Sequence, residues 1–146
     1  MEFHRILIAI DSNPSSEVIA QSGLQLAQQY KSEVALISVI NEDDQLDTDP
    51  PTSTELTDMM EHICNKHQLN VIDKVFKGTP VKSFIEKGTA YKAIIKIAEQ
   101  WGADIIVMGT HGKKGLTHLI MGSVAEQVIR HSKKTVVVIP VIDPHS

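Results

Sequence analysis

The chain has 146 residues and a net charge of −4, with 42% hydrophobic and 22% charged residues; this size and composition indicate one globular domain, residues 1–146, and exclude a disordered chain. The single cysteine, Cys64, excludes a disulfide scaffold and a cysteine-rich zinc site within one chain. The 14 basic and 18 acidic residues leave no basic footprint for nucleic acid, and no apolar run reaches about 18 residues, so we expect a cytoplasmic protein without a membrane span.

The first elements alternate between strand and helix patterns. Ile6–Ile10 is a continuous apolar run, which is typical of a strand buried on both faces. The cap and turn residues 11–17 follow, and apolar residues at helical spacing then predict a helix to about Tyr30. Glu33–Ile40 predicts the second strand.

The middle of the chain holds the ambiguous segment. We interpret the acidic stretch Glu42–Asp49 as a solvated loop, because its spacing fits no calcium loop. Leu56 begins a helical stripe that Val71–Phe76 can continue up to Gly78, although Val71–Phe76 also fits a strand. We favour the helix because Val81–Ile85 is the better strand candidate.

The last third repeats the alternation. Ala90–Trp101 predicts an amphipathic helix closed by Gly102, and Asp104–Met108 predicts a strand. Ser123–His131 predicts the next helix, and Thr135–Ile139 the last strand. Strands that alternate with helices in this way predict an α/β fold, with a parallel sheet covered on both faces.

Ligands of such sheets bind beyond the carboxyl ends of the strands, where the strand order reverses. The residues to inspect are therefore the ones just after each predicted strand, namely Asp11, Asn41, Gly88 and Gly109. The chain contains neither a Walker P-loop nor a GxGxxG dinucleotide motif after its first strand.

The segment from Gly109 to Val124 has two features of a phosphate site. Its glycines allow backbone N–H groups to approach an anion, and Gly122-Ser123-Val124 opens a helix whose unpaired N–H groups favour phosphate. The alternative is that the glycines serve turns and that Ser123 is an N-cap.

The spacing Gly109-x2-Gly112-x9-Gly122-Ser123 resembles the G-x2-G-x9-G-[ST] signature of the ATP-binding universal stress proteins. Arg5–Ser12, Asp104–Gly112 and Met121–Glu126 are also similar to segments of that family. The resemblance implies a single-domain, three-layer sandwich around a five-stranded parallel sheet of order 3-2-1-4-5. This is the Rossmann-like fold of the adenine nucleotide alpha hydrolases.

The resemblance also implies an adenine-nucleotide site, for which the expected ligand is ATP, with or without Mg²⁺. AMP and cyclic AMP stay open, because a glycine cradle recognises phosphate and not the number of phosphates. Strand ends would meet the adenosine and helix Ser123–His131 the phosphates. The implied binding residues are Ala9, Ile10, Asp11, Val39, Met108, Gly109, Gly112, Gly122, Ser123 and Val124.

We identify no nucleophile paired with a base and no histidine spacing of a metal site, so we assign no catalytic and no metal-binding residue. The first hypothesis is a nucleotide-dependent regulatory or binding module that acts in stress response. The alternatives are a slow ATPase or phosphotransferase at the same site, and an interaction module without nucleotide.

The resemblance implies a homodimer through Thr135–Ile139, an apolar strand at the sheet edge. The sequence does not name a protein partner.

Overall fold

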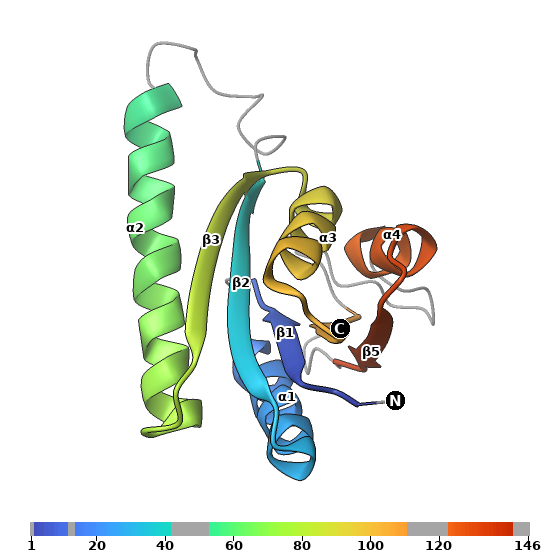
Figure 1. The fold of residues 1–146 in the computed structure, drawn as a ribbon. Coiled ribbons are helices and arrows are strands. Elements are labelled where there is room, and N and C mark those ends of the chain that lie inside the picture. Colours follow the sequence, from blue (N-terminus) through green and yellow to red (C-terminus); the bar gives the residue numbers. More distant parts are fainter. Residues whose placement is uncertain (1, 12–13, 42–52, 111–122, 142–146) are drawn as a thin grey trace.

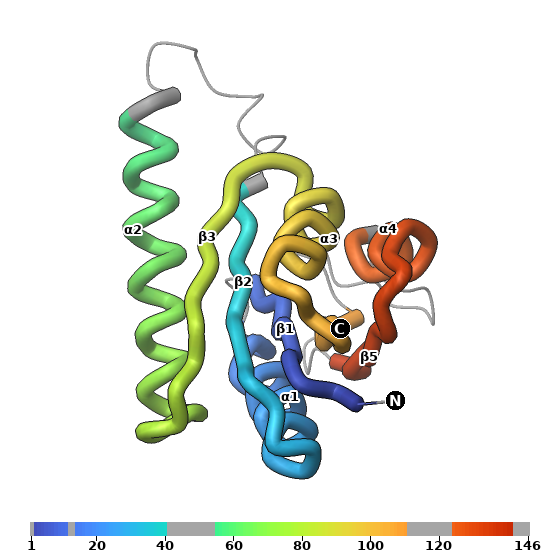
Figure 2. The backbone as a smooth tube through the Cα atoms, in the orientation of Figure 1, coloured from blue at the N-terminus to red at the C-terminus, as the bar shows by residue number. Residues whose placement is uncertain are grey.

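The computed structural model describes residues 2–11, 14–41, 53–110 and 123–141 (Figure 1). Its centre is a sheet of five parallel strands in the order β3-β2-β1-β4-β5, which confirms the predicted α/β fold and strand order. Figure 2 follows the backbone and shows the N-terminal strand inside the sheet. The strands are β1 (Arg5–Ala9), β2 (Glu33–Asn41), β3 (Lys82–Gly88), β4 (Ile105–Gly109) and β5 (Thr135–Ile139).

Helices cover both faces of the sheet and complete three layers (Figure 1). Two helices and a π-helical turn pack on one face: α1 (Ser16–Tyr30), α2 (Ser53–Val71) and η3 (Ile72–Phe76). The other face is covered by α3 (Ala90–Trp101) and α4 (Ser123–His131).

The central strands are mainly apolar because both of their faces are buried. Ile6 and Ile8 of β1 face α1 and η3, in a cluster that also holds Phe76. Leu7 and Ala9 face α3 and α4, in a second cluster that holds Ile94. Successive side chains of a strand point to opposite faces, so five consecutive apolar residues supply both cores.

Polar groups fix the amino-terminal end of β1 against β4. The carboxylate of Asp104 accepts the backbone N–H groups of His4 (2.8 Å) and Arg5 (3.0 Å), and the Asp104 N–H donates to the Arg5 carbonyl (2.8 Å). The Arg5 guanidinium pairs with Glu33 at the start of β2 (2.7 Å) and lies over the Trp101 ring. These bonds set the register of three strands, and with it the level at which their carboxyl ends meet.

The segment that had two interpretations is helical. Residues 72–76 continue α2 as η3, which confirms the favoured alternative. Within η3, the side chains of Val75 and Phe76 are buried. The helix ends at Phe76, and Lys77 takes the left-handed conformation with φ 33°, so the cap precedes the predicted Gly78. Gly78 is also left-handed, with φ 91°.

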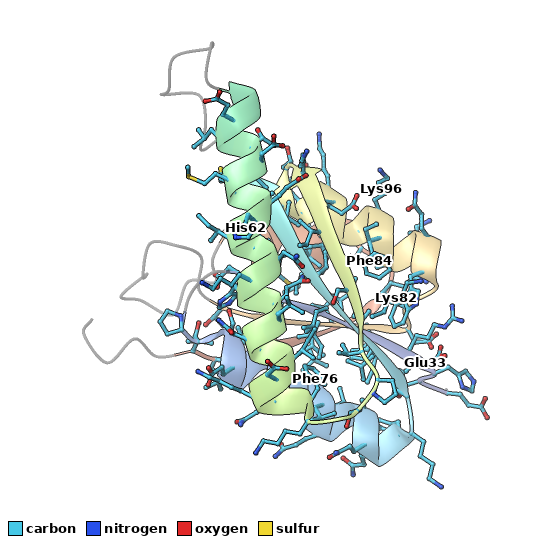
Figure 3. The ribbon with its side chains drawn as sticks, turned by 90° about the vertical axis from the view of Figure 1, so that its left-hand side faces the viewer. Glu33, His62, Phe76, Lys82, Phe84 and Lys96 are labelled. Carbon is cyan, nitrogen blue, oxygen red and sulfur yellow. The ribbon has the colours of Figure 1, made fainter. Side chains whose placement is uncertain are left out.

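The third strand ends at Gly88, the glycine that the sequence marked at its end, so β3 runs three residues beyond the apolar segment Val81–Ile85. Glu86, Lys87 and Gly88 pair with Val39, Ile40 and Asn41, because β2 continues that far. Glu86 and Lys87 are polar, so the apolar pattern alone stops at Ile85. Figure 3 shows Lys82 and Phe84 on this strand, where the Lys82 ammonium lies 5.4 Å from the centre of the Phe84 ring.

Candidate functional site

A pocket lies at the carboxyl ends of β1, β2 and β4, on the face covered by α3 and α4. The chain order reverses between β1 and β4, so this is the switch point at which doubly wound sheets bind ligands. The three strands and the residues directly after them contribute Ala9, Ile10, Asp11, Ile37, Val39, Met108, Gly109 and Thr110, and the helices contribute Ile19, Ala90, Ile94, Val124 and Ala125.

The wall of the pocket is mainly apolar. Ile37 and Val39 are two residues apart and lie on the same face of β2. Met108 ends the buried part of β4, and Ile94 belongs to α3. Side chains of this kind can enclose a flat apolar group such as a nucleobase, and a few polar groups then orient it. The described polar side chains of the lining are those of Asp11 and Thr110.

Two helices begin at the pocket. Ala90 is the first residue of α3, and Val124 lies in the first turn of α4; both line the pocket. A helix N-terminus carries unpaired N–H groups and a partial positive charge. The open side of the pocket can therefore stabilise an anionic group, such as a phosphate.

Asp11 follows β1 and is half-buried at the pocket. The preceding residue, Ile10, still belongs to the sheet, because its N–H donates to the Ile37 carbonyl (3.0 Å). The buried Ser16 hydroxyl donates to the Asp11 carbonyl at 2.6 Å. The sheet and the start of α1 thus hold Asp11 from both sides.

Gly109 and Thr110 connect the pocket to the segment that follows β5. A Cβ atom at Gly109 would lie 2.6 Å from Ile19 Cδ1 and 3.2 Å from Val141 Cγ2, so any side chain here would force Ile19 to shift. The Thr110 N–H donates to the Ile139 carbonyl (3.1 Å), and the Thr110 hydroxyl accepts the Val141 N–H (3.1 Å). The end of β4 therefore holds the chain on either side of Pro140.

The structure brings together most of the residues that the sequence singled out. Ala9, Ile10, Asp11, Val39, Met108, Gly109 and Val124 all line this one pocket. Ser123 begins α4, and its backbone alone is described. Gly112 and Gly122 lie outside the described residues.

Sequence reasoning missed the other lining residues. Ala90 and Ile94 are one helical turn apart on α3, and Ile37 precedes Val39 by two residues, so the periods of helix and strand would have added them once Gly88 and Val39 were chosen. Ile19, Thr110 and Ala125 have no such signal, because only the packing of α1, β4 and α4 brings them to the pocket.

No group of three or more His, Cys, Asp or Glu within residues 2–11, 14–41, 53–110 and 123–141 could hold a metal ion. Among the same residues, no helix combines the length and apolarity that crossing a membrane requires.

A parallel sheet with an apolar pocket at its switch point, faced by two helix N-termini, defines a doubly wound α/β domain with a small-ligand site. More particularly, the chain belongs to the universal stress protein family, whose sequence model matches residues 2–140. Universal stress protein MJ0531 of Methanocaldococcus jannaschii is 30% identical over 139 residues, which are 94% of this chain and 82% of that protein.

Solved structures of the family share the fold. Protein MJ0577 of the same organism superposes with a TM-score of 0.79 at 30% identity, over 98% of this chain and 99% of that chain. A sequence alignment with MJ0577 reaches 48% identity over 62 residues, which span 42% of this chain and 38% of that protein. A universal stress protein in complex with cAMP has a TM-score of 0.66 at 17% identity, over 96% of this chain and 98% of that chain.

Proposed function

We propose that the chain, as a single domain, is an ATP-binding regulatory module of the cytoplasm that acts in stress response. The observation that carries the proposal is the pocket itself, which gathers the ends of three strands and the starts of two helices around an apolar wall. Seven residues that the family resemblance implied as ligand contacts line it, namely Ala9, Ile10, Asp11, Val39, Met108, Gly109 and Val124.

The chemistry of the pocket matches the parts of an adenine nucleotide. The apolar wall suits the base, and the Asp11 carboxylate can accept a hydrogen bond from a ribose hydroxyl or from the adenine amino group. The N-termini of α3 and α4 suit the phosphates. The glycine spacing from Gly109 to Ser123 supports a triphosphate cradle, to which Mg²⁺ would come with the nucleotide.

The comparisons support an adenine nucleotide as the class of ligand. A protein of the same fold was solved in complex with cAMP. ATP is our proposal for this chain because the full G-x2-G-x9-G-[ST] spacing occurs in it. We propose a binding role because the apolar lining and the two helix N-termini suit recognition of a nucleotide, and the Thr110 hydroxyl already accepts the Val141 N–H.

The proposed module is a homodimer that pairs through β5. This strand forms one edge of the described sheet, and its four apolar residues, Val136–Ile139, are half-buried in the single chain. An apolar edge with unpaired backbone groups favours pairing with a second copy by two-fold symmetry. The nucleotide acts as a switch if its affinity differs between two states of the module.

The first experiment measures the nucleotide that the purified protein carries. The protein is denatured, the released small molecules are separated by chromatography, and binding of ATP with Mg²⁺ is then titrated. The key variant is Ala90→Leu, which fills the pocket with a residue that suits a helix. The control is Gln100→Leu, which adds the same side chain to an exposed position of α3.

We expect ATP from the unmodified protein and from Gln100→Leu, and none from Ala90→Leu. A steady release of ADP during incubation with ATP would assign turnover to the site and replace the regulatory module by a slow ATPase. The absence of released nucleotide, together with no binding in the titration, would refute the proposed function.

A further inference from the structure

Ser16 is the first residue of α1 and is fully buried, with 0% of its surface exposed. Its neighbour Ser15 occupies the N-cap position, yet the Ser15 side chain makes no capping hydrogen bond. The chain therefore buries a hydroxyl beside a cap position at which hydroxyls are usually placed to cap the helix. A buried hydroxyl is costly unless it is paired, so its partner indicates its role.

That partner is Asp11. The Ser16 oxygen lies 2.6 Å from the Asp11 carbonyl oxygen and 3.4 Å from Asp11 Oδ1. A hydroxyl has one hydrogen, so the short distance identifies the carbonyl as its main acceptor. The bond fixes the backbone of Asp11, a residue that lines the pocket.

We propose that Ser16 is a positioning residue of the ligand site, which holds Asp11 so that its carboxylate recognises a hydrogen-bond donor of the bound nucleotide. The inference rests on the proposed function, since it assigns the ligand to the same pocket. Ser16 itself is not among the described lining residues, so it acts through Asp11 and not by contact.

The physical effect is preorganisation. With the hydroxyl bond in place, the carboxylate meets the ligand in one orientation, and little conformational entropy is lost on binding. Without it, Asp11 samples more orientations and the ligand bears the cost of ordering them. One net hydrogen bond corresponds to a loss of affinity of about three- to tenfold. The loss concerns only ligands that offer the donor.

The experiment compares Ser16→Ala with Asp11→Ala and with the matched control Ser15→Ala. Calorimetric titration measures the affinity for ATP, for 2′,3′-dideoxy-ATP, which lacks the ribose hydroxyls, and for inosine triphosphate, which lacks the adenine amino group. Thermal unfolding of every variant is recorded in parallel. Ser16→Cys has a slightly larger side chain and a weaker donor, and it replaces Ser16→Ala if the latter does not fold.

We expect the unmodified protein to prefer ATP over one of the two analogues, and Asp11→Ala to lose that preference. Ser16→Ala should reduce the preference for ATP about three- to tenfold. The double variant Asp11→Ala/Ser16→Ala should show little further loss, and Ser15→Ala should keep the preference. A Ser16→Ala protein that melts earlier but keeps the preference would overturn the inference and leave the proposed function intact. An unmodified protein that binds none of the three nucleotides would overturn both.

Discussion

Gly109 offers a sharp test of how the pocket is packed, through the substitution Gly109→Ala. The added Cβ would lie 2.6 Å from Ile19 Cδ1, 3.3 Å from Ile19 Cγ1 and 3.2 Å from Val141 Cγ2. Carbon atoms pack best at about 3.5–4.0 Å, so the end of the Ile19 side chain must move by about 1 Å. Ile19 is only 4% exposed, but its side chain also borders the pocket, which takes up part of this shift.

Overpacking of this kind costs about 1–3 kcal/mol of unfolding free energy. The loss of glycine freedom in the unfolded chain offsets about 0.4–1 kcal/mol of it. The net expectation is a destabilisation of about 1–2 kcal/mol. Ile19→Val removes the atom that clashes and by itself costs about 0.5–1.5 kcal/mol. The double variant should therefore be more stable than the sum of the two single effects predicts, by about 1 kcal/mol.

Urea unfolding, followed by the fluorescence of the single tryptophan, Trp101, measures all four proteins. Gly78→Ala is the control, because Gly78 has open space around its Cβ position but a φ of +91°. Its cost comes from backbone strain, and it should add to that of Ile19→Val without any interaction. The packing argument fails if Gly109→Ala and Ile19→Val are also additive.

Three further substitutions test other features of the molecule. Gln68 is 1% exposed and donates to Ser38 (2.9 Å) and to the Phe84 carbonyl (3.0 Å), so Gln68→Ala should cost about 2 kcal/mol in urea unfolding. Asn70→Ala, at an exposed position of the same helix, should change the unfolding free energy by less than about 0.5 kcal/mol. A cost equal to that of Gln68→Ala would contradict the role of the Gln68 hydrogen bonds. Thr110→Val removes the acceptor of the Val141 N–H, so this amide should exchange hydrogen faster, with a loss of about 1 kcal/mol; unchanged exchange would refute the link between β4 and the segment after β5. Val138→Lys should convert the proposed dimer to a monomer in light scattering, and an unchanged dimer mass would exclude β5 as the interface. Val138 is preferable to Val137 for this test, because Val137 packs against the core cluster.

The helices and strands were predictable where the apolar residues form a continuous run or recur at helical spacing. Ile6–Ile10 and Thr135–Ile139 are continuous apolar runs, and each strand lies within one residue of its run. The end of β3 was marked by Gly88 and not by the apolar pattern, because Glu86 and Lys87 are polar and pair with β2 through their backbones. Hydrogen bonds between backbones leave no trace in the side-chain pattern of the strand that receives them.

Some residues of the candidate site were likewise predictable from the sequence, and others were not. Asp11 and Gly109 were identified because polar and glycine residues directly follow apolar strands, which is a local signal. Ser16 carries no such signal, since a serine at a helix start is ordinary and only the structure shows its hydrogen bond to Asp11. Gln68 likewise resembles any polar residue of a helix until the packing of α2 buries it.

The sequence by itself determined which segments form strands and helices, and which residues stand at the strand ends, because these properties depend on neighbours along the chain. The residues alone left the neighbours of each strand open, and the expected strand order came from the family resemblance. Only the tertiary structure decided that β1 lies against β4, with Ile8 beside Val107, so that Asp11 and Gly109 line one pocket. The physical reason is that strand pairing and helix packing join residues far apart in sequence, and each such contact must offset the entropy of closing a long loop.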